Sequence, residues 1–447
     1  MKLLLLTTGL ALSMPLFAFG NHASVQLNQT LQHATNQTLQ ANQALGATAI
    51  EVSVLLPDET TPRDFVAGTQ ATGKDARKAT TYMMVQYGSI TKAYTATLLL
   101  NEIKQNKHAF PQGLNTQLGR LTALQPEFQS GQWPARWKSV TVAELLNMTS
   151  GIPASVNNFK VLASINPYAH YSPDQLIAMG AHYEQTTPAC AQAHDTNAGC
   201  FAPGSQYFYS NTNYIIAGLL VQRYADKHSE AENTFAHIMN TAVLRPVLGP
   251  HTQTCVAGPK HLNALCYDTH TPSAKMRRHM IHGYYHNVFS GPYLKPGMDM
   301  IKTNLSSSNS AGALTGTTDG LARLTRALFT NVFHSQAALT HSRYMVVQTA
   351  PGQPVQHVHA IQTSCTGTTY CYGLGVTPAY HPILGTVWTY GGKTFGFGTE
   401  YIWIPRENVV IIFSMNTSVS QYKTDALLVP VVNAINYYLG YPTISHW

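Results

Sequence analysis

Ser89 and Lys92 lie three residues apart, and a largely apolar run at 93–100 follows them. Residues with this spacing share one face of a helix, so the lysine amine would lie one turn away from the serine hydroxyl. Burial disfavours the charged form of an amine and leaves it able to accept a proton. A serine hydroxyl is a weak nucleophile until a neighbouring base assists it. The pair therefore indicates nucleophilic acyl transfer.

A second polar group, in the segment 203–214, could complete such a site. Acyl transfer also needs a proton relay, a donor that orients the substrate and an oxyanion hole. Tyr209 could carry protons if a nearby lysine cation lowers its pKa. Asn211 could donate a hydrogen bond to a substrate carbonyl. We therefore expect Tyr209 and Asn211 to lie beside Ser89.

Three other matches to short motifs lack supporting context. The segment 420–423 repeats Ser-x-x-Lys without the same surroundings. The segment 285–287 repeats Tyr-x-Asn, but it lacks the Pro-Gly before it and the apolar helix after it. The segment 392–394 resembles the end of a phosphate-binding loop, but Val387 stands where that loop needs a glycine. We assign no chemistry to these three segments.

The elements that must position the site follow from the hydrophobic pattern and the turn residues. Helices are expected around Ser89 and Lys92 and at 141–148, 213–224, 319–329 and 424–438, with Thr317 and Thr318 as N-cap candidates for the fourth. Strands are expected at 48–56, 64–67, 385–391, 397–404 and 409–415.

The short turn at 405–408 favours an antiparallel sheet, because parallel strands need a long crossover connection. We therefore predict an α+β fold in which both chain ends build one antiparallel sheet flanked by helices. The sheet subdomain would comprise 45–108 and 300–447, and a mostly helical insert would span about 109–299. The segment 255–296 is loop-rich, and no role follows from its sequence.

The first twenty residues have the pattern of an export signal. Lys2 supplies the positive start, 3–17 is largely apolar, and 18–20 offers small residues for cleavage. No later run of about 20 apolar residues follows that could span a membrane. We therefore expect a signal peptide at 1–20 and a serine hydrolase domain at 21–447, exported to the periplasm or secreted, with no membrane span after cleavage.

The six cysteines form three close pairs along the chain. In an exported chain, an even count at short spacing predicts local disulfides. The expected pairs are Cys190 with Cys200, Cys255 with Cys266, and Cys365 with Cys371. None has the Cys-x-x-Cys spacing of a zinc site.

Charge and histidine content argue against nucleic-acid and metal binding. The net charge is +7, and there is no dense run of lysine and arginine. Among the 20 histidines, His279, His282 and His286 could share a helical face, and His357 and His359 a strand face. Neither set has a carboxylate or cysteine ligand nearby in sequence. We expect no metal, no cofactor and no nucleic-acid partner.

Four blocks of the chain, in this order, resemble the serine hydrolases that include class C β-lactamases, D-Ala-D-Ala carboxypeptidases and related esterases. The blocks are 87–97, 141–153, 203–220 and 390–397, with a weaker fifth at 310–322. They span most of the mature chain. The resemblance implies a β-lactamase/transpeptidase-like fold and a two-step reaction through an acyl-enzyme on Ser89.

The resemblance also implies roles for single residues. Lys92 and Tyr209 would share the general-base work, and Asn211 would orient the substrate. The backbone N–H groups of Ser89 and Lys393 would form the oxyanion hole.

The third motif of the family, usually Lys/His-Thr/Ser-Gly, corresponds to Tyr390-Gly391-Gly392, which would bind the substrate. In carboxylate-recognising members, the cation and the hydroxyl of this motif help to bind the substrate carboxylate. An aromatic first residue is typical of the esterases, whereas an intact Tyr209-Ser210-Asn211 resembles the peptidases and β-lactamases.

The expected function is an exported serine acyl hydrolase, in the first place a penicillin-binding D-Ala-D-Ala carboxypeptidase-like peptidase. The alternatives are a β-lactamase-like carboxylesterase, a class C β-lactamase, and an inactive homologue that only binds ligand. The substrate would be a small peptide, an ester or a β-lactam, and peptidoglycan stem peptides would suit an exported enzyme.

Overall fold

The computed structural model describes residues 16–154, 165–191, 199–225, 234–249, 265–287, 291–419 and 425–447. Cys255, and with it the expected Cys255–Cys266 pair, lies outside these ranges, as does the second Ser-x-x-Lys segment at 420–423. None of the helices in the described ranges has the length and hydrophobicity needed to span a lipid bilayer.

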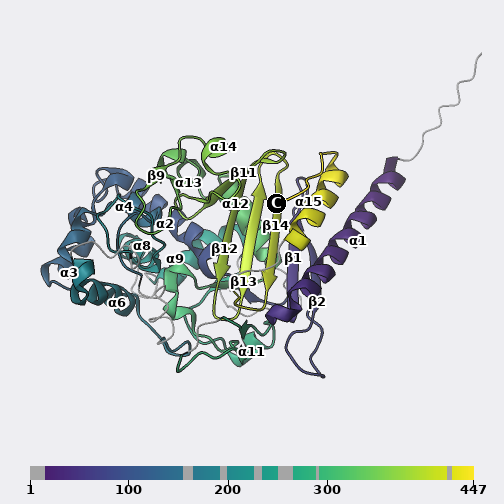
Figure 1. The fold of residues 1–447 in the computed structure, drawn as a ribbon, viewed down its shortest axis with the longest axis horizontal. Helices are drawn as coiled ribbons and strands as arrows, with labels where there is room; N and C mark the ends of the chain where they lie inside the picture. Colours follow the sequence, from purple (N-terminus) through teal and green to yellow (C-terminus); the bar gives the residue numbers. More distant parts are fainter. Residues whose placement is uncertain are drawn as a thin grey trace, which may run out of the picture.

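A six-stranded antiparallel sheet forms the centre of the fold (Figure 1). Its order is β11 (Thr377–His381), β12 (Gly385–Lys393), β13 (Gly398–Ile404), β14 (Val409–Met415), β1 (Ala49–Leu55) and β2 (Arg63–Gly68). The two chain ends meet where β1 pairs with β14, with Val52 opposite Phe413. The predicted α+β fold with one antiparallel sheet is confirmed.

The alternation of side chains along each strand divides the core in two. On β14, Val410 and Ile412 face a large core that also contains apolar residues of the helices on that side of the sheet. Ile411 and Phe413 face a second core on the other side of the sheet. All four side chains are buried, so the sheet is covered on both faces.

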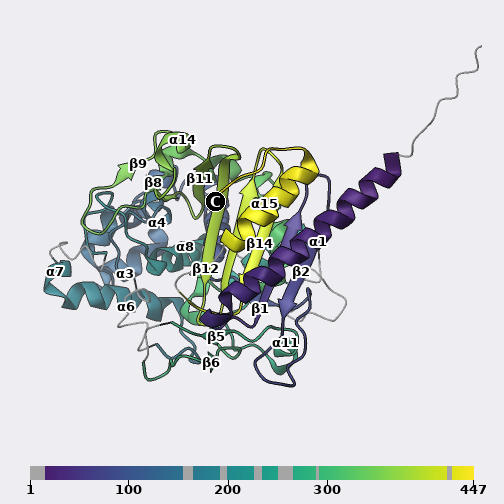
Figure 2. The same ribbon diagram turned by 45° about the vertical axis from the view of Figure 1, so that its right-hand side comes forward.

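Two helices cover the second face of the sheet. They are α1 (Leu16–Asn42) and α15 (Asp425–Leu439), which pack against each other across the strands (Figure 2). The N-terminal end of α1 projects beyond the sheet (Figure 1). Leu27 and Leu31 of this helix are buried in the second core.

The first face is covered by α12 (Thr318–Phe329), and the helices α2 (Thr91–Gln105) and α8 (Asn211–Tyr224) pack into the same core. Helix α12 packs on β1 and β14, and α2 packs on α8. Of the two expected N-cap candidates for α12, Thr317 is the cap, because its side chain accepts a hydrogen bond from the backbone N–H of Gly320.

The remaining elements lie mainly between residues 109 and 372. The helices are α3 (Gln125–Gln129), α4 (Val142–Leu146), α6 (Pro173–Thr186), α7 (Pro188–Ala191), α9 (Phe235–Met239), α10 (Arg245–Leu248), α11 (Ala274–Arg277), α13 (Gln336–Leu339) and α14 (Ile361–Ser364). The short strands are β3 (Val85–Gln86), β4 (Leu265–Tyr267), β5 (Tyr284–Tyr285), β6 (Met298–Asp299), β7 (Leu314–Gly316), β8 (Val346–Val347), β9 (Gln356–His357) and β10 (Cys371–Tyr372). Between residues 109 and 299, the described elements are short and long helices together with β4, β5 and β6. The division into a sheet subdomain and a helical insert stays a prediction.

The expectation that His279, His282 and His286 could share a helical face is wrong. Helix α11 ends at Arg277, and the chain is extended again at β5. The His282 Nδ1 atom instead lies 2.6 Å from Asp299 Oδ2 on β6.

Candidate active site

Ser89 lies in the 3₁₀ turn η2 (Gly88–Ile90), directly before α2. Gly88 has a φ of +54°, and a Cβ placed there would lie 2.7 Å from the backbone nitrogen of Lys393. Only glycine allows this close approach without strain. Thr91 holds the turn from the other side, because its Oγ1 donates to the Gly88 carbonyl over 2.7 Å. The serine is therefore fixed between α2 and the end of β12.

Lys92 lies in the first turn of α2, and its Nζ is 3.0 Å from Ser89 Oγ and 2.9 Å from the Ala311 carbonyl. The side chain is completely buried. This burial holds the pKa of Lys92 well below its usual range. The geometry and the burial together give Ser89 a neighbouring amine that can be neutral and can accept a proton.

Tyr209 approaches Ser89 from the segment before α8, and its hydroxyl donates to Ser89 Oγ over 2.7 Å. Burial raises the pKa of Tyr209 to about 12, although hydrogen bonds with Ser89 and Tyr390 act in the opposite direction. Lys92 is not among the groups that lower this pKa. The Lys92 Nζ lies 4.9 Å from the centre of the Tyr209 ring, but its own burial favours the uncharged amine. In the resting site Tyr209 is a proton donor.

Tyr390, on β12, directs its hydroxyl toward Tyr209, with 3.1 Å between the two oxygens. The Tyr372 hydroxyl on β10 lies 2.9 Å from that of Tyr390. Tyr390 is only 7 % exposed. Tyr390, which was expected to bind the substrate, thus contacts Tyr209, a candidate catalytic residue. Sequence reasoning missed Tyr372, because no local motif marks it.

The end of β12 passes close to the backbone of Ser89. A Cβ on Gly392 would overlap the Tyr87 carbonyl and lie 2.7 Å from the Ser89 nitrogen. A Cβ on Gly391 would meet only the Thr399 carbonyl, at 4.0 Å. The backbone of Lys393 lies against Gly88, so the expected oxyanion-hole nitrogens of Ser89 and Lys393 come from adjacent segments. Their role stays a prediction.

Asn211 is the first residue of α8, two positions after Tyr209, and it is partly buried. Its role in orienting the substrate stays a prediction. In the described ranges, no group of three or more His, Cys, Asp or Glu side chains is placed to hold a metal ion.

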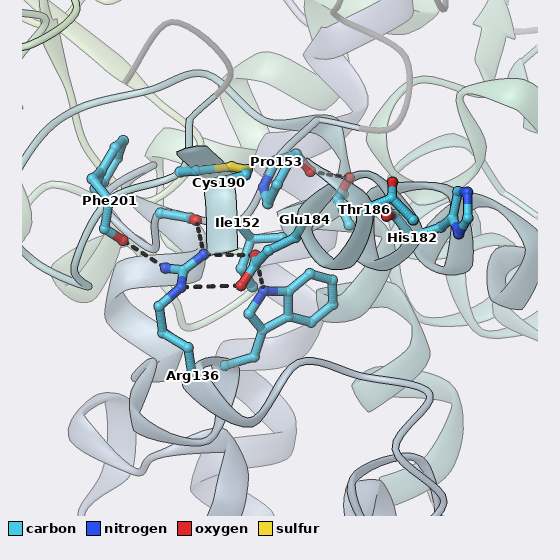
Figure 3. The surroundings of a disulfide bond; sticks show 12 residues. Arg136, Ile152, Pro153, His182, Glu184, Thr186, Cys190 and Phe201 are labelled. Atoms are coloured by element: carbon cyan, nitrogen blue, oxygen red, sulfur yellow. Dashed lines mark hydrogen bonds and ion pairs between the residues drawn. A yellow bond between two sulfur atoms is a disulfide. The ribbon is translucent and has the colours of Figure 1, made fainter. Parts of the chain in front are cut away.

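Arg136 ties together two loop segments near the Cys190–Cys200 disulfide (Figure 3). The Arg136 guanidinium donates to the carbonyls of Phe201, over 2.5 Å, and of Gly151, over 2.8 Å. The same group pairs with Glu184 over 2.6 Å, and Trp137 Nε1 donates to that carboxylate over 2.7 Å. This cluster links the 149–153 loop with the segment that leads to Tyr209.

Both of the expected cysteine pairs that lie wholly within the described residues are joined. Cys190 and Cys200 have a Cα separation of 5.0 Å, and Cys365 and Cys371 one of 5.5 Å. The first pair joins α7 to the segment before Tyr209 (Figure 3), and the second directly precedes Tyr372.

Comparison with known proteins places these features in context. A family model described as beta-lactamase matches residues 62–431. A D-amino acid amidase from Ochrobactrum anthropi SV3, solved with D-phenylalanine, has a TM-score of 0.65 at 16% identity, covering 93% of this chain and 99% of its own.

Two further solved structures are similar. A D-stereospecific amidohydrolase from a Streptomyces species has a TM-score of 0.62 at 19% identity, covering 90% of this chain and 98% of its own. A penicillin binding protein from Bacillus halodurans has a TM-score of 0.57 at 17% identity, covering 90% of this chain and 99% of its own. At these identities the likeness concerns the fold alone.

Proposed function

The chain belongs to the beta-lactamase family, and on this premise we propose that it is a serine acyl hydrolase that cleaves amide bonds through an acyl-enzyme on Ser89. One observation carries the proposal. Ser89 Oγ lies 3.0 Å from the buried amine of Lys92 and 2.7 Å from the hydroxyl of Tyr209. A base and an acid are thus both within hydrogen-bonding reach of the nucleophile.

Acylation would use both partners of the serine. The neutral Lys92 amine takes the Ser89 proton while Oγ bonds to the acyl carbon. The carbon–nitrogen bond then breaks as Tyr209 gives its proton to the leaving nitrogen. Backbone N–H groups of Ser89 and Lys393 would hold the oxyanion. The acyl-enzyme is left with a Lys92 ammonium and a Tyr209 phenolate.

Deacylation would reverse these proton transfers with water as the nucleophile. The Tyr209 phenolate takes a proton from the water that attacks the acyl carbon. Ser89 Oγ leaves as the Lys92 ammonium returns its proton to it. Over one cycle an amide and a water become an acid and an amine, and the site returns to its starting state.

The third motif favours a substrate whose leaving group carries no carboxylate. Tyr390 provides no cation, and Gly391 provides no hydroxyl, at the positions that recognise a carboxylate in other members of the family. One of the similar structures is named as a D-amino acid amidase and another as a D-stereospecific amidohydrolase. Both points support a small D-amino acid amide over a peptide with a free C-terminus.

A D-Ala-D-Ala carboxypeptidase-like activity is the second candidate, because Lys393 is exposed directly after the third motif. Its backbone lies against the Ser89 turn, and its side chain supplies a cation directly after the motif. This activity would make the protein a penicillin-binding one. The esterase, β-lactamase and inactive-homologue alternatives have less support.

We also propose that the protein is exported. The support is the signal-like pattern at 1–20 and the two joined cysteine pairs, since disulfides persist mainly outside the cytosol.

The test measures ammonia release from D-phenylalanine amide by the wild type and by Ser89→Ala. Release by the wild type alone, together with an unchanged unfolding temperature in the variant, supports the amidase. Intact mass after mixing with a penicillin is recorded in parallel. A lasting adduct that needs Ser89, without amide hydrolysis, favours the carboxypeptidase-like activity. No hydrolysis of amides or esters and no adduct would refute the proposal in favour of an inactive homologue.

A further inference from the structure

Three tyrosine hydroxyls form a hydrogen-bonded chain that leads from Ser89 into the protein interior. Tyr209 contacts Ser89 Oγ at 2.7 Å, Tyr390 contacts Tyr209 at 3.1 Å, and Tyr372 contacts Tyr390 at 2.9 Å. Tyr390 and Tyr372 are buried at 7 % and 1 % exposure. The three rings come from the segment before α8, from β12 and from β10, so only the folded chain brings them together.

Each phenol has one proton to donate, and this fixes which hydroxyl is the donor in each hydrogen bond of the chain. The proton of Tyr209 is directed to Ser89 Oγ, so its oxygen accepts in the contact with Tyr390. The proton of Tyr390 is then used, so its oxygen accepts from Tyr372. All three O–H dipoles therefore point toward the serine. The bond from Tyr390 also works to lower the pKa of Tyr209, against the effect of burial.

We propose that Tyr390, supported by Tyr372, is a positioning residue that acts through Tyr209 and stabilises the phenolate that Tyr209 becomes when it protonates the leaving group. The proposal rests on the proposed acyl-enzyme function. Tyr390 would replace the motif's usual cation with a neutral donor. A negative charge on the Tyr209 oxygen strengthens the hydrogen bond that it accepts from Tyr390.

The step conserves protons and charge within the site. The carbon–nitrogen bond of the amide breaks, and its electron pair takes the Tyr209 proton. The negative charge stays on the Tyr209 oxygen, and the Lys92 ammonium formed earlier balances it. Tyr390 and Tyr372 keep their protons, since no acceptor is needed beyond Tyr209.

This role predicts a dependence on the leaving group. An amine departs only if its nitrogen is protonated, so an amide needs the proton of Tyr209. A p-nitrophenolate leaves without a proton, so its ester does not need that transfer. Loss of the Tyr390 hydroxyl should therefore slow acylation by an amide and spare acylation by an activated ester with the same acyl group.

The experiment compares kcat/KM for D-phenylalanine amide and for the p-nitrophenyl ester of D-phenylalanine, in the wild type, Tyr390→Phe and Tyr372→Phe. A hydrogen bond to a charged group supports a loss of about 10- to 100-fold for the amide in Tyr390→Phe. The ester rate should stay within about 2-fold, which also shows that the variant is folded. Tyr372→Phe should give a smaller loss of the same selective kind.

Tyr401 offers a matched control, because it lies directly opposite Tyr390 in the β12–β13 register. It is also fully buried, but its hydroxyl has no hydrogen-bond partner among the described residues. Tyr401→Phe should leave both rates unchanged.

Equal losses on the two substrates in Tyr390→Phe, or no loss on the amide, would overturn the role of Tyr390 and leave the proposed function standing. A wild type that is acylated by neither substrate would overturn both. A selective loss in Tyr401→Phe equal to that in Tyr390→Phe would show that the loss does not depend on the hydrogen-bonded tyrosine hydroxyls. That result would also overturn the role of Tyr390.

Discussion

The thioether sulfur of Met148 accepts a hydrogen bond from the backbone N–H of Ser210 across 3.3 Å. The Met148 carbonyl accepts from the N–H of Phe208 across 2.9 Å. One residue thus holds the chain on both sides of Tyr209. Met148 has a φ of 67°, a left-handed conformation that costs a residue with a side chain about 1–2 kcal/mol. Such a conformation persists only where the surroundings enforce it.

Met148→Leu should therefore lower activity more than its small change in volume suggests. Leucine fills the space but leaves the buried N–H of Ser210 without its acceptor, at a cost of about 1–3 kcal/mol. We expect a lower kcat with little change in KM, because the position of Tyr209 changes and the substrate contacts do not. Met239→Leu, at another fully buried methionine, is the control for the loss of the sulfur. Equal effects in both variants would contradict the positioning role.

The part of the site that could be predicted from sequence is the part set by local spacing. Ser89 and Lys92 lie side by side because they are three residues apart at the start of α2. Tyr209 was proposed from the chemistry of its own segment, and the resemblance to a known family supported it. Met148 and Tyr372 were missed, because their contacts with Ser210 and Tyr390 exist only in the folded chain.

Lys92→Met should abolish activity and change how stability depends on pH. Burial lowers the pKa of Lys92 in the folded state, whereas in the unfolded chain it is about 10.4. The folded state thus binds fewer protons, so this group makes the wild type more stable as pH rises toward 10. The methionine variant lacks that rise.

The measurement is the difference in unfolding temperature, variant minus wild type, at pH 6 and at pH 9. It should be smaller at pH 9. The lost bond to the Ala311 carbonyl is common to both pH values and cancels. Lys104→Met, at an exposed position, should give the same difference at both pH values. A Lys92→Met difference that stays constant would contradict a lowered pKa.

Asp64 should make the protein less stable as pH rises from about 4 to about 7. Burial raises its pKa to about 7, Ser53 and Arg323 act against this, and Asp319 adds to it. The folded state thus binds the extra proton in that window, and the stabilisation is lost as pH rises through the folded pKa. The neighbouring buried Glu51 has a pKa raised by burial and by Asp64, so it acts in the same direction.

Urea midpoints of the wild type and of Asp64→Asn at pH 4, 6 and 8 would test this. The asparagine resembles the protonated acid, so the variant should match the wild type at pH 4 and exceed it at pH 8. Asp75→Asn, at an exposed position, should not change the pH profile. An Asp64→Asn profile parallel to that of the wild type would refute the assignment.

Helix α1 shows why part of the fold could not be predicted. Its sequence is rich in Gln, Asn and Thr, and its sparse leucines give no strong amphipathic pattern. Leu27, Leu31 and Leu39 are nevertheless buried against the sheet and α15. Packing rather than local pattern stabilises this helix, as is general for helices in proteins. The strands β13 and β14, by contrast, are short apolar segments joined by a tight turn, and these features were sufficient to predict them.

Arg136→Met should destabilise the protein by about 3–5 kcal/mol, since it leaves the buried Glu184 carboxylate without its cation. The carbonyls of Gly151 and Phe201 lose their donor as well, so the two loop segments that Arg136 joins should loosen and kcat should fall. In the double variant Arg136→Met/Glu184→Gln, the uncompensated charge is gone while Trp137 Nε1 keeps an acceptor. Its free energy of unfolding, measured in urea, should therefore exceed that of the single variant. A double variant no more stable than Arg136→Met would show that the bonds to the two carbonyls, rather than the ion pair, account for the loss.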